Sequence, residues 1–292
     1  MSELVAALDI GGTHVSAARV NVESAAVEPG SGCRIPFRPD GSRSELLAAI
    51  LRAATSGAGA ERCGVAVPGP FDYEGGVCTI RGVGKLEALY GVDLRHELGS
   101  ALGLEDENAV RFLNDADAFL LGEWWAGAAC GHGRAIGLTL GTGLGSAFLE
   151  HGRIVDDRSD VPPEGSLHLV PFRGAPVEHV ISRRGLLALY GLRADGEVDV
   201  ADLAERARAD ERRAQEAFSH FGSALAEFVT PWVRSFSPTS LVVGGSIARA
   251  WDLIGPVLEA ELSATPGLEV ITRAQNLDDA PLLGAARFAM AT

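Results

Sequence analysis

An apolar segment that ends at Leu113 leads directly into Asn114, Asp115 and Asp117, where the sequence becomes helical. A carboxylate in such a place can accept the proton of a substrate alcohol, and open α/β sheets bind their ligands at the carboxyl ends of strands. Asn and Asp also cap helices, so one of these side chains could simply accept hydrogen bonds from the first backbone N–H groups. These residues alone leave open the choice between a catalytic carboxylate and a cap.

Glycine-rich turns follow apolar segments at three places: DIGGT at 9–13, LGTGLG at 140–145 and VVGGS at 242–246. Glycine lets the backbone approach an anion closely and point successive N–H groups at it. The third turn also begins a helix, whose N-terminus favours anions. Each turn alone could be an ordinary tight turn. Three of them, together with a carboxylate-bearing strand end, indicate phosphate binding.

The elements that must position these residues form two similar halves. Residues 4–20 and 134–155 each predict two antiparallel strands joined by a glycine turn. An offset of 130 aligns Gly11 with Gly141 and also Leu8 with Leu138, which indicates a duplicated domain. The first half continues with a strand at 62–70, a helix at 93–103 and a strand at 109–115. The second half continues with helices over 201–236, ended by FVTPWVRSFSP, and a strand at 240–246.

The composition is that of a globular protein with a large core: 292 residues, 47% of them hydrophobic, and a net charge of −14. This charge disfavours nucleic acids and acidic membranes as partners, because both need a basic protein surface. The chain has a single lysine, Lys85, which is not followed by Ser or Thr. A Walker-type site and a protein kinase are therefore excluded, and glycine turns must hold any nucleotide.

The cysteines stand far apart and form no CxxC pair, which argues against a zinc ribbon and a disulfide scaffold. No apolar run is long enough to span a bilayer, and the start MSELVAALDIGG lacks the pattern of a signal peptide. We therefore expect a cytoplasmic protein with reduced thiols.

These motifs, in this order, resemble those of the ROK family of sugar kinases, within the superfamily of actin and hexokinase. The family's two phosphate motifs are similar to LDIGGTHVSAARV and GLTLGTGLGSAFLEHGRIV, and its PGP turn is similar to VAVPGPFDYEGGV. Its sugar and catalytic motif resembles FLNDADAFLLGEWWAGAACG, and its adenosine motif resembles LVVGGSIA. The resemblance covers essentially the whole chain. It implies an α/β fold of two actin-like (ribonuclease H-like) domains flanking a ligand cleft. We place these domains at 1–117, completed by the C-terminal helix 281–292, and at 118–280.

The resemblance also assigns roles to individual residues. Asp115 would be the catalytic base, Asn114 would hold sugar hydroxyls, and Asp9 would orient Mg²⁺ through water. Asp117 is interpreted as a cap or structural residue. ATP would be bound by the three turns, at Gly11, Gly12, Thr13, Gly141, Thr142, Gly143, Gly244, Gly245 and Ser246.

The chain departs from the family pattern in residues 162–186, which read PPEGSLHLVPFRGAPVEHVISRRGL. His168 matches the histidine of the family's ExGH motif, but Gly165 stands three positions before it and Glu164 is one step away. Glu178 resembles a later sugar-binding glutamate. We expect Glu164, His168 and Glu178 to contact the sugar, although His168 and Glu178 could instead be loop residues whose hydrogen bonds are satisfied within the protein. The family's zinc cysteines are missing here, so no zinc site is expected.

We therefore expect an ATP-dependent hexose kinase that forms a sugar 6-phosphate, with glucose or a related hexose as acceptor. The alternatives are a sugar-sensing regulator without turnover and a kinase that uses polyphosphate. Regulators of the family place a helix-turn-helix domain before the first phosphate motif, and here that motif begins at Asp9. The expected partners are a hexose, ATP and a second copy of the chain in a homodimer, without nucleic acid or membrane.

Overall fold

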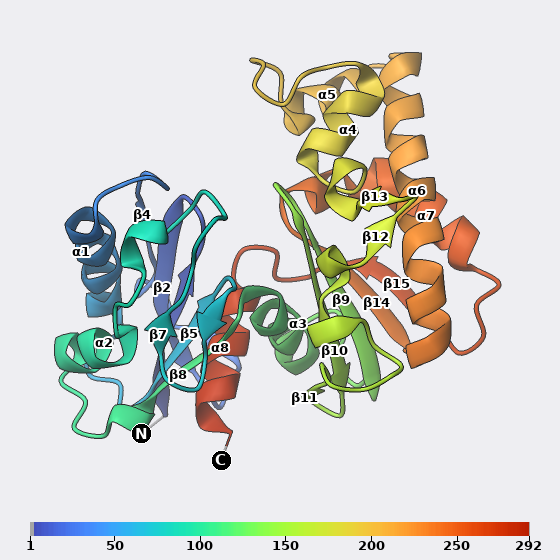
Figure 1. The fold of residues 1–292 in the computed structure, drawn as a ribbon. Coiled ribbons are helices and arrows are strands. Elements are labelled where there is room, and N and C mark those ends of the chain that lie inside the picture. Colours follow the sequence, from blue (N-terminus) through green and yellow to red (C-terminus); the bar gives the residue numbers. More distant parts are fainter. Residues whose placement is uncertain (1–2, 292) are drawn as a thin grey trace. The chain divides into compact units, whose positions relative to one another are not determined.

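The computed structural model describes residues 3–291, apart from the side chain of Glu107. Contacts divide the chain into two compact units, Met1–Gly127 with Asp278–Thr292 and Ala128–Leu277, whose elements are labelled in Figure 1. The boundary expected after residue 117 would cut helix α3 (Asp115–Ala126), which instead lies wholly in the first unit. The C-terminal helix α8 (Ala280–Met290) belongs to that unit as well.

A six-stranded sheet forms the centre of the first unit, in the order β3-β2-β1-β5-β8, with β4 also paired to β2. β2 is antiparallel to β1, whereas β1, β5 and β8 are parallel, so the last three strands end at the same edge of the sheet. A separate hairpin, β6 with β7, follows β5. The strands are β1 (Leu4–Ile10), β2 (His14–Asn21), β3 (Ala26–Val27), β4 (Cys33–Pro36), β5 (Cys63–Val67), β6 (Phe71–Asp72), β7 (Val77–Cys78) and β8 (Val110–Asn114).

Alternate residues of β1 pack against two different helical layers, as the period of a strand requires. Leu8 lies in one buried cluster with Leu46 and Ile50 of α1 (Arg43–Ala54), and Ala7 lies in another with Leu283 of α8. A capping box begins α1, and Asp93 caps α2 (Leu94–Leu102) by accepting a hydrogen bond from the backbone of the third helical residue.

Helix α8 packs against both α3 and the sheet at glycine positions that leave no room for a side chain. A Cβ on Gly284 would lie 1.8 Å from the carbonyl oxygen of Ala118 in α3. A Cβ on Gly64 of β5 would lie 1.9 Å from the carbonyl oxygen of Ala285. These approaches fix α3, and with it the residues at its start, relative to β5 and β8.

The second unit repeats the sheet order of the first, β11-β10-β9-β14-β15, with the β9–β10 hairpin antiparallel and β9, β14 and β15 parallel. This shared order agrees with the predicted duplication. The offset of 130 does not hold through both strands of the hairpin, however, because Leu8 pairs with Ala17 whereas Leu138 pairs with Ser146. The second turn is one residue shorter. The strands are β9 (Arg134–Leu140), β10 (Leu144–Glu150), β11 (Arg153–Ile154), β14 (Ser240–Gly244) and β15 (Val270–Arg273), with a small hairpin of β12 (Pro171–Phe172) and β13 (Ala175–Pro176).

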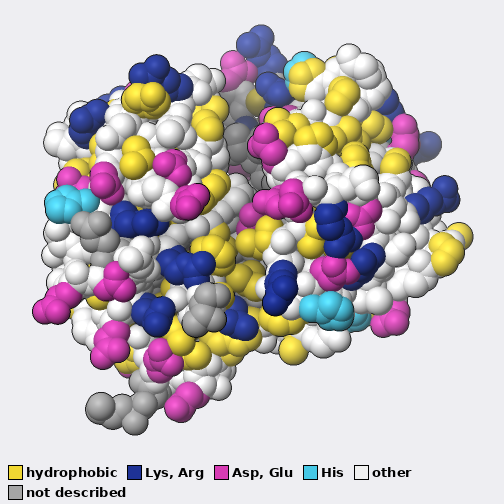
Figure 2. Space-filling view, turned by 60° about the horizontal axis from the view of Figure 1, so that its bottom comes forward, with side chains coloured by type: hydrophobic (Ala, Val, Ile, Leu, Met, Phe, Trp, Pro, Cys, Tyr) yellow, Lys and Arg dark blue, Asp and Glu magenta, His cyan; other side chains and the backbone are white. Residues whose placement is uncertain are grey.

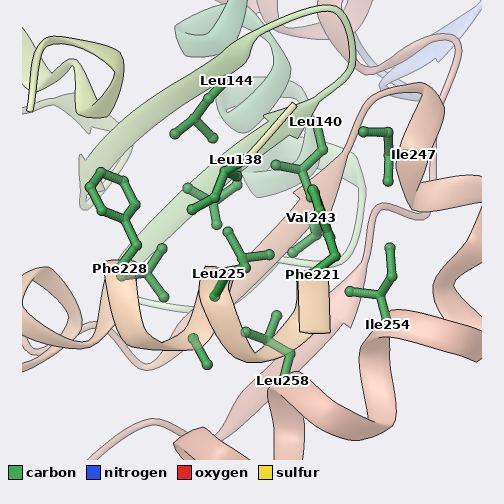
Figure 3. Packing of buried hydrophobic residues seen from close by; sticks show 14 of the residues in the cluster. Leu138, Leu140, Leu144, Phe221, Leu225, Phe228, Val243, Ile247, Ile254 and Leu258 are labelled. Atoms are coloured by element: carbon green, nitrogen blue, oxygen red, sulfur yellow. The ribbon is translucent and has the colours of Figure 1, made fainter. Parts of the chain in front are cut away.

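The core of the second unit lies between this sheet and helices α6 and α7 (Figure 3). Phe221, Leu225 and Phe228 of α6 point toward Leu138 and Val243 of the sheet. Their spacing of three and four residues places them on one face of the helix. The helical region predicted over 201–236 is two helices, which are separated at residues 209–211. The helices are α4 (Arg183–Tyr190), α5 (Val200–Arg208), α6 (Arg212–Phe236) and α7 (Trp251–Leu262).

On the face shown in Figure 2, acidic and basic side chains are interspersed with hydrophobic ones. Several of the arginines pair with carboxylates, as Arg19 does with Glu28 and Arg173 with Glu227. Pairs that are exposed, like Arg173 with Glu227, contribute little to stability. No helix within residues 3–291 combines the length and apolarity that crossing a membrane requires.

The close approach of α8 to α3 predicts a large cost for a single added methyl group. Gly284→Ala should lower the free energy of unfolding by about 2–3 kcal/mol, because the new Cβ would overlap a backbone oxygen and the helices must separate. Gly99→Ala in α2 is the matched control, since its Cβ would meet only Val110 Cγ2 at 3.9 Å. We expect the control to be neutral or stabilising by up to about 1 kcal/mol. Equal urea midpoints for the two variants would contradict this packing account.

Candidate functional site

Asn114 and Asp115 stand where β8 ends and α3 begins, at the carboxyl edge of the first sheet. Asn114 is the N-cap of α3: its Oδ1 accepts a hydrogen bond of 2.9 Å from the amide of Ala116. Asp115 Oδ1 accepts from the same amide at 2.9 Å. The capping interpretation is therefore correct for Asn114. It does not remove the other interpretation, because Asp115, half-buried at the positive end of the helix, keeps a position suited to an anionic side chain.

Tyr73 fixes the other end of the Asn114 amide and was not singled out from the sequence. Asn114 Nδ2 donates to the Tyr73 hydroxyl at 3.2 Å, and that hydroxyl donates to the carbonyl of Val67 at 3.1 Å. Burial raises the pKa of Tyr73, so the hydroxyl stays protonated. Tyr73 belongs to the FDY sequence that directly follows the PGP turn, but nothing in that sequence predicts a hydrogen bond to Asn114.

Asp9 lies on β1, close enough to Asp115 for the charge of Asp115 to act on it. Burial, and to a lesser degree the charge of Asp115, raise the pKa of Asp9 to about 7, while Arg34 opposes the shift. In the protein alone, the charge of one carboxylate therefore disfavours ionisation of the other. A cation between or beside them would relieve the repulsion.

The turn after Asp9 has the compact backbone expected of it. The amide of Gly11 donates to the carbonyl of His14 at 2.9 Å, while Thr13 at the tip is exposed. Arg34 Nη2 lies 3.4 Å from His14 Nδ1. Burial and this arginine lower the pKa of His14, so its imidazole is neutral near pH 7. Asp9, the turn at 11–13, Asn114 and Asp115 are thus brought together within the first unit.

In the second unit the turn at 141–143 is held by Glu178. The amide of Leu144 donates to Glu178 Oε1 at 3.0 Å, and a Cβ on Gly143 would lie 2.2 Å from that oxygen. The amide of Arg183 donates to the carbonyl of Gly141 at 2.7 Å. Glu178 is therefore a fixed neighbour of the turn at 141–143, and its carboxylate is hydrogen-bonded within the protein, as the alternative of a satisfied loop residue predicts. Its contact with the sugar stays a prediction.

The turn at Gly244–Ser246 lies beside the turn at 141–143, because β14 and β9 are adjacent parallel strands. A Cβ on Gly141 would lie 3.5 Å from Ser246 Oγ, in ordinary contact. Gly245 has a φ of 82°, and a Cβ there would lie 2.3 Å from the carbonyl oxygen of Leu140. Only glycine suits this position. Two of the three predicted turns therefore form one glycine-lined edge of the second unit. Thr142 is exposed to solvent at this edge.

Glu164 and His168 lie on exposed 3-10 turns of the second unit. Ser146 of β10 ties this segment down, since its Oγ donates to the carbonyl of Gly165 at 2.7 Å and accepts from the amide of Leu167 at 2.8 Å. Within residues 3–291, neither the Glu164 nor the His168 side chain has a hydrogen bond to the turn at 141–143. Their role as sugar ligands stays a prediction.

The residues present fit a water-mediated magnesium ion better than a protein cage. Across the described part of the chain, no group of three or more His, Cys, Asp and Glu side chains could hold a metal ion. Mg²⁺ commonly binds through one or two carboxylates, several waters and substrate phosphates. The crowded carboxylates of Asp9 and Asp115 beside a glycine turn match that donor set.

Comparison with known proteins gives a consistent result. The family profile described as ROK family matches residues 5–292. The chain is 28% identical to a glucokinase of Thermotoga maritima, over 96% of this chain and 95% of that protein. It is also 28% identical to an N-acetyl-D-glucosamine kinase of Pectobacterium atrosepticum, over 95% and 96%. A ROK family glucokinase from Streptomyces griseus, solved in complex with glucose and AMPPNP, shares the fold with a TM-score of 0.77 at 22% identity, over 98% of both chains.

The raised pKa of Asp9 predicts a pH-dependent effect of Asp9→Asn on stability. Well below pH 4 the carboxyl is protonated in the folded and unfolded chains alike. Between pH 4 and 7 the unfolded carboxyl ionises first, so the wild-type protein loses stability as the pH rises and the variant does not. We compare the free energy of unfolding of the variant with that of the wild type, without Mg²⁺ and nucleotide. The variant's value minus the wild-type value should increase by at least about 1 kcal/mol between pH 5 and 8. A difference that stays constant in urea titrations over this range would show that Asp9 titrates normally.

Proposed function

Because the chain belongs to the ROK family, we propose that it is an ATP-dependent kinase that phosphorylates a hexose, glucose or a related sugar, at its 6-hydroxyl. The observation that carries this proposal is the place of Asp115: it begins a helix at the carboxyl edge of the sheet, beside Asp9 and the glycine turn that follows it. A carboxylate base next to an anion-binding turn is what phosphoryl transfer to an alcohol requires.

Asp115 accepts the proton of the sugar hydroxyl while the hydroxyl oxygen forms its bond to the γ-phosphorus of ATP. The bond from that phosphorus to the bridging oxygen breaks at the same time, and its electrons remain on ADP. Asn114 orients the sugar, because its cap bond and its bond to Tyr73 hold the amide in one place. Bound Mg²⁺ would neutralise charge on the phosphates, and Asp9 would hold its water shell.

The glycine-lined edge of the second unit, at 141–143 and 244–246, binds the nucleotide phosphates and the adenosine. Glu178 serves the sugar and at the same time fixes the turn, and Glu164 and His168 complete the sugar contacts. The names of the relatives, glucokinase and N-acetyl-D-glucosamine kinase, support a sugar of this class. The glucose and AMPPNP bound by the Streptomyces griseus protein support the same pair of substrates.

The acceptor can be identified by measuring ADP release with a panel that contains glucose, mannose, N-acetylglucosamine, N-acetylmannosamine and fructose, each with ATP or polyphosphate as the donor. We expect saturable ADP release with at least one hexose and ATP. Sugar binding without turnover under all these conditions would favour a sensing role and overturn the proposal.

Asp115→Asn should lower kcat by roughly 10²–10⁴-fold with a much smaller change in sugar affinity, because it removes the proton acceptor and keeps the shape of the side chain. Asp117→Asn is the matched control two residues further along the same helix. It should stay within about tenfold of wild type. Comparable losses in both variants would mean that negative charge at the start of α3, and not a specific base, is what the reaction needs.

Metal removal should separate catalysis from folding. Residues 164–180 contain no cysteine, so strong zinc chelation should leave the melting temperature unchanged. Turnover should disappear when Mg²⁺ and Mn²⁺ are removed and return when either is added. One equivalent of zinc per chain in protein purified without added metal would contradict this expectation.

A further inference from the structure

The only lysine of the chain lies on the first phosphate turn. A Cβ on Gly12 would be 3.1 Å from Lys85 Cδ, so the stem of the lysine runs directly over the turn. Lys85 is half-buried, and it comes from a distant segment, the glycine-rich loop between β7 and α2. From the sequence alone, the context of Lys85 indicates only that a Walker motif is absent.

The loop holds Lys85 in this place through the residues on either side of it. The amide of Gly84 donates to Glu87 Oε1 at 2.7 Å, and the amide of Leu86 donates to the carbonyl of Pro39 at 3.1 Å. Leu86 is fully buried and has a φ of 58°, a left-handed conformation that is costly for a branched side chain. Such strain persists only where the surrounding packing imposes it, and it concentrates at functional sites.

No acidic side chain of the described residues pairs with Lys85. Among residues 3–291 its ammonium group has no hydrogen bond and no ion pair, although the chain carries 39 acidic residues. The cation that opposes the raised pKa of the nearby Asp9 is Arg34. A half-buried lysine over a glycine turn with no acidic partner is suited to an anion that binds to the turn.

We propose that Lys85 binds the phosphoryl group that is transferred, together with the backbone N–H groups of the turn at 11–13. This inference rests on the proposed kinase function and adds a residue to it. During transfer, negative charge is spread over the oxygens of this group while the new bond to the sugar oxygen forms and the bond to ADP breaks. A fixed ammonium group lowers the energy of that state without taking part in any proton transfer.

Chemical labelling can test the contact directly, because an amine-specific acylating reagent has only Lys85 and the α-amino group as targets. With Mg²⁺ present, saturating AMPPNP should slow acylation of Lys85, followed by mass spectrometry, at least about fivefold. ADP, which lacks the γ-phosphoryl group, should slow it much less. Equal protection by the two nucleotides, or none by either, would overturn the proposal.

Substitution provides a second test with a matched control on the same loop. Lys85→Met keeps the stem and removes the charge, and it should lower kcat about 10²-fold or more while the KM for the sugar changes less than about threefold. Arg81→Met removes a cation on the same loop that lies 3.5 Å from the centre of the Tyr90 ring, and it should leave kcat within about threefold. Lys85→Arg should retain more activity than Lys85→Met.

The outcomes distinguish this inference from the kinase proposal itself. If the wild-type protein phosphorylates a sugar and Lys85→Met is equally active, the role of Lys85 is wrong and the kinase assignment stands. If the wild-type protein phosphorylates no sugar, the kinase proposal fails, and the labelling experiment still decides whether Lys85 meets a γ-phosphoryl group. If Lys85→Met does not fold, labelling of the wild-type protein decides alone.

Discussion

The central constraint in the first unit is that two carboxylates lie at one edge of its sheet. Asp9 and Asp115 belong to β1 and to the helix after β8, and the parallel course of β1, β5 and β8 brings both to the carboxyl edge. Burial and mutual repulsion make this arrangement unfavourable in the protein alone. Three surrounding features supply positive potential: the N–H groups of the glycine turn, the N-terminus of α3 and the guanidinium group of Arg34.

Such an unfavourable site needs a rigid frame, and close glycine packing provides it. Gly284 and Gly64 let α8 approach α3 and β5 to backbone contact, so α3 cannot move away to relieve the repulsion at its first residue. In the second unit Glu178 and Gly245 do the same for the glycine-lined edge, because each leaves its turn a single arrangement. Both units therefore combine the same sheet order with close packing at individual glycines.

Much of this could be predicted from the sequence, since alternation, glycine turns and strand-end carboxylates are local signals. The hairpins, β8 and the position of Asp115 follow from them. The N-cap role of Asn114 could be listed only as an alternative, because the same residue types serve both purposes. Tyr73 and Lys85 could not be placed, because their partners, Asn114 and Gly12, are distant in sequence and no pattern records the contact. The shortened second turn was hidden by glycines that align at either register.

The most direct test of the account is to identify the reaction product by phosphorus NMR. Protein, Mg·ATP and the sugar that gives the fastest ADP release are incubated together, and the spectrum is recorded with proton coupling. We expect a new phosphomonoester signal, split by the two protons of the sugar's 6-methylene group, that grows in step with ADP. Formation of inorganic phosphate alone, or no consumption of ATP with any sugar of the panel, would contradict it.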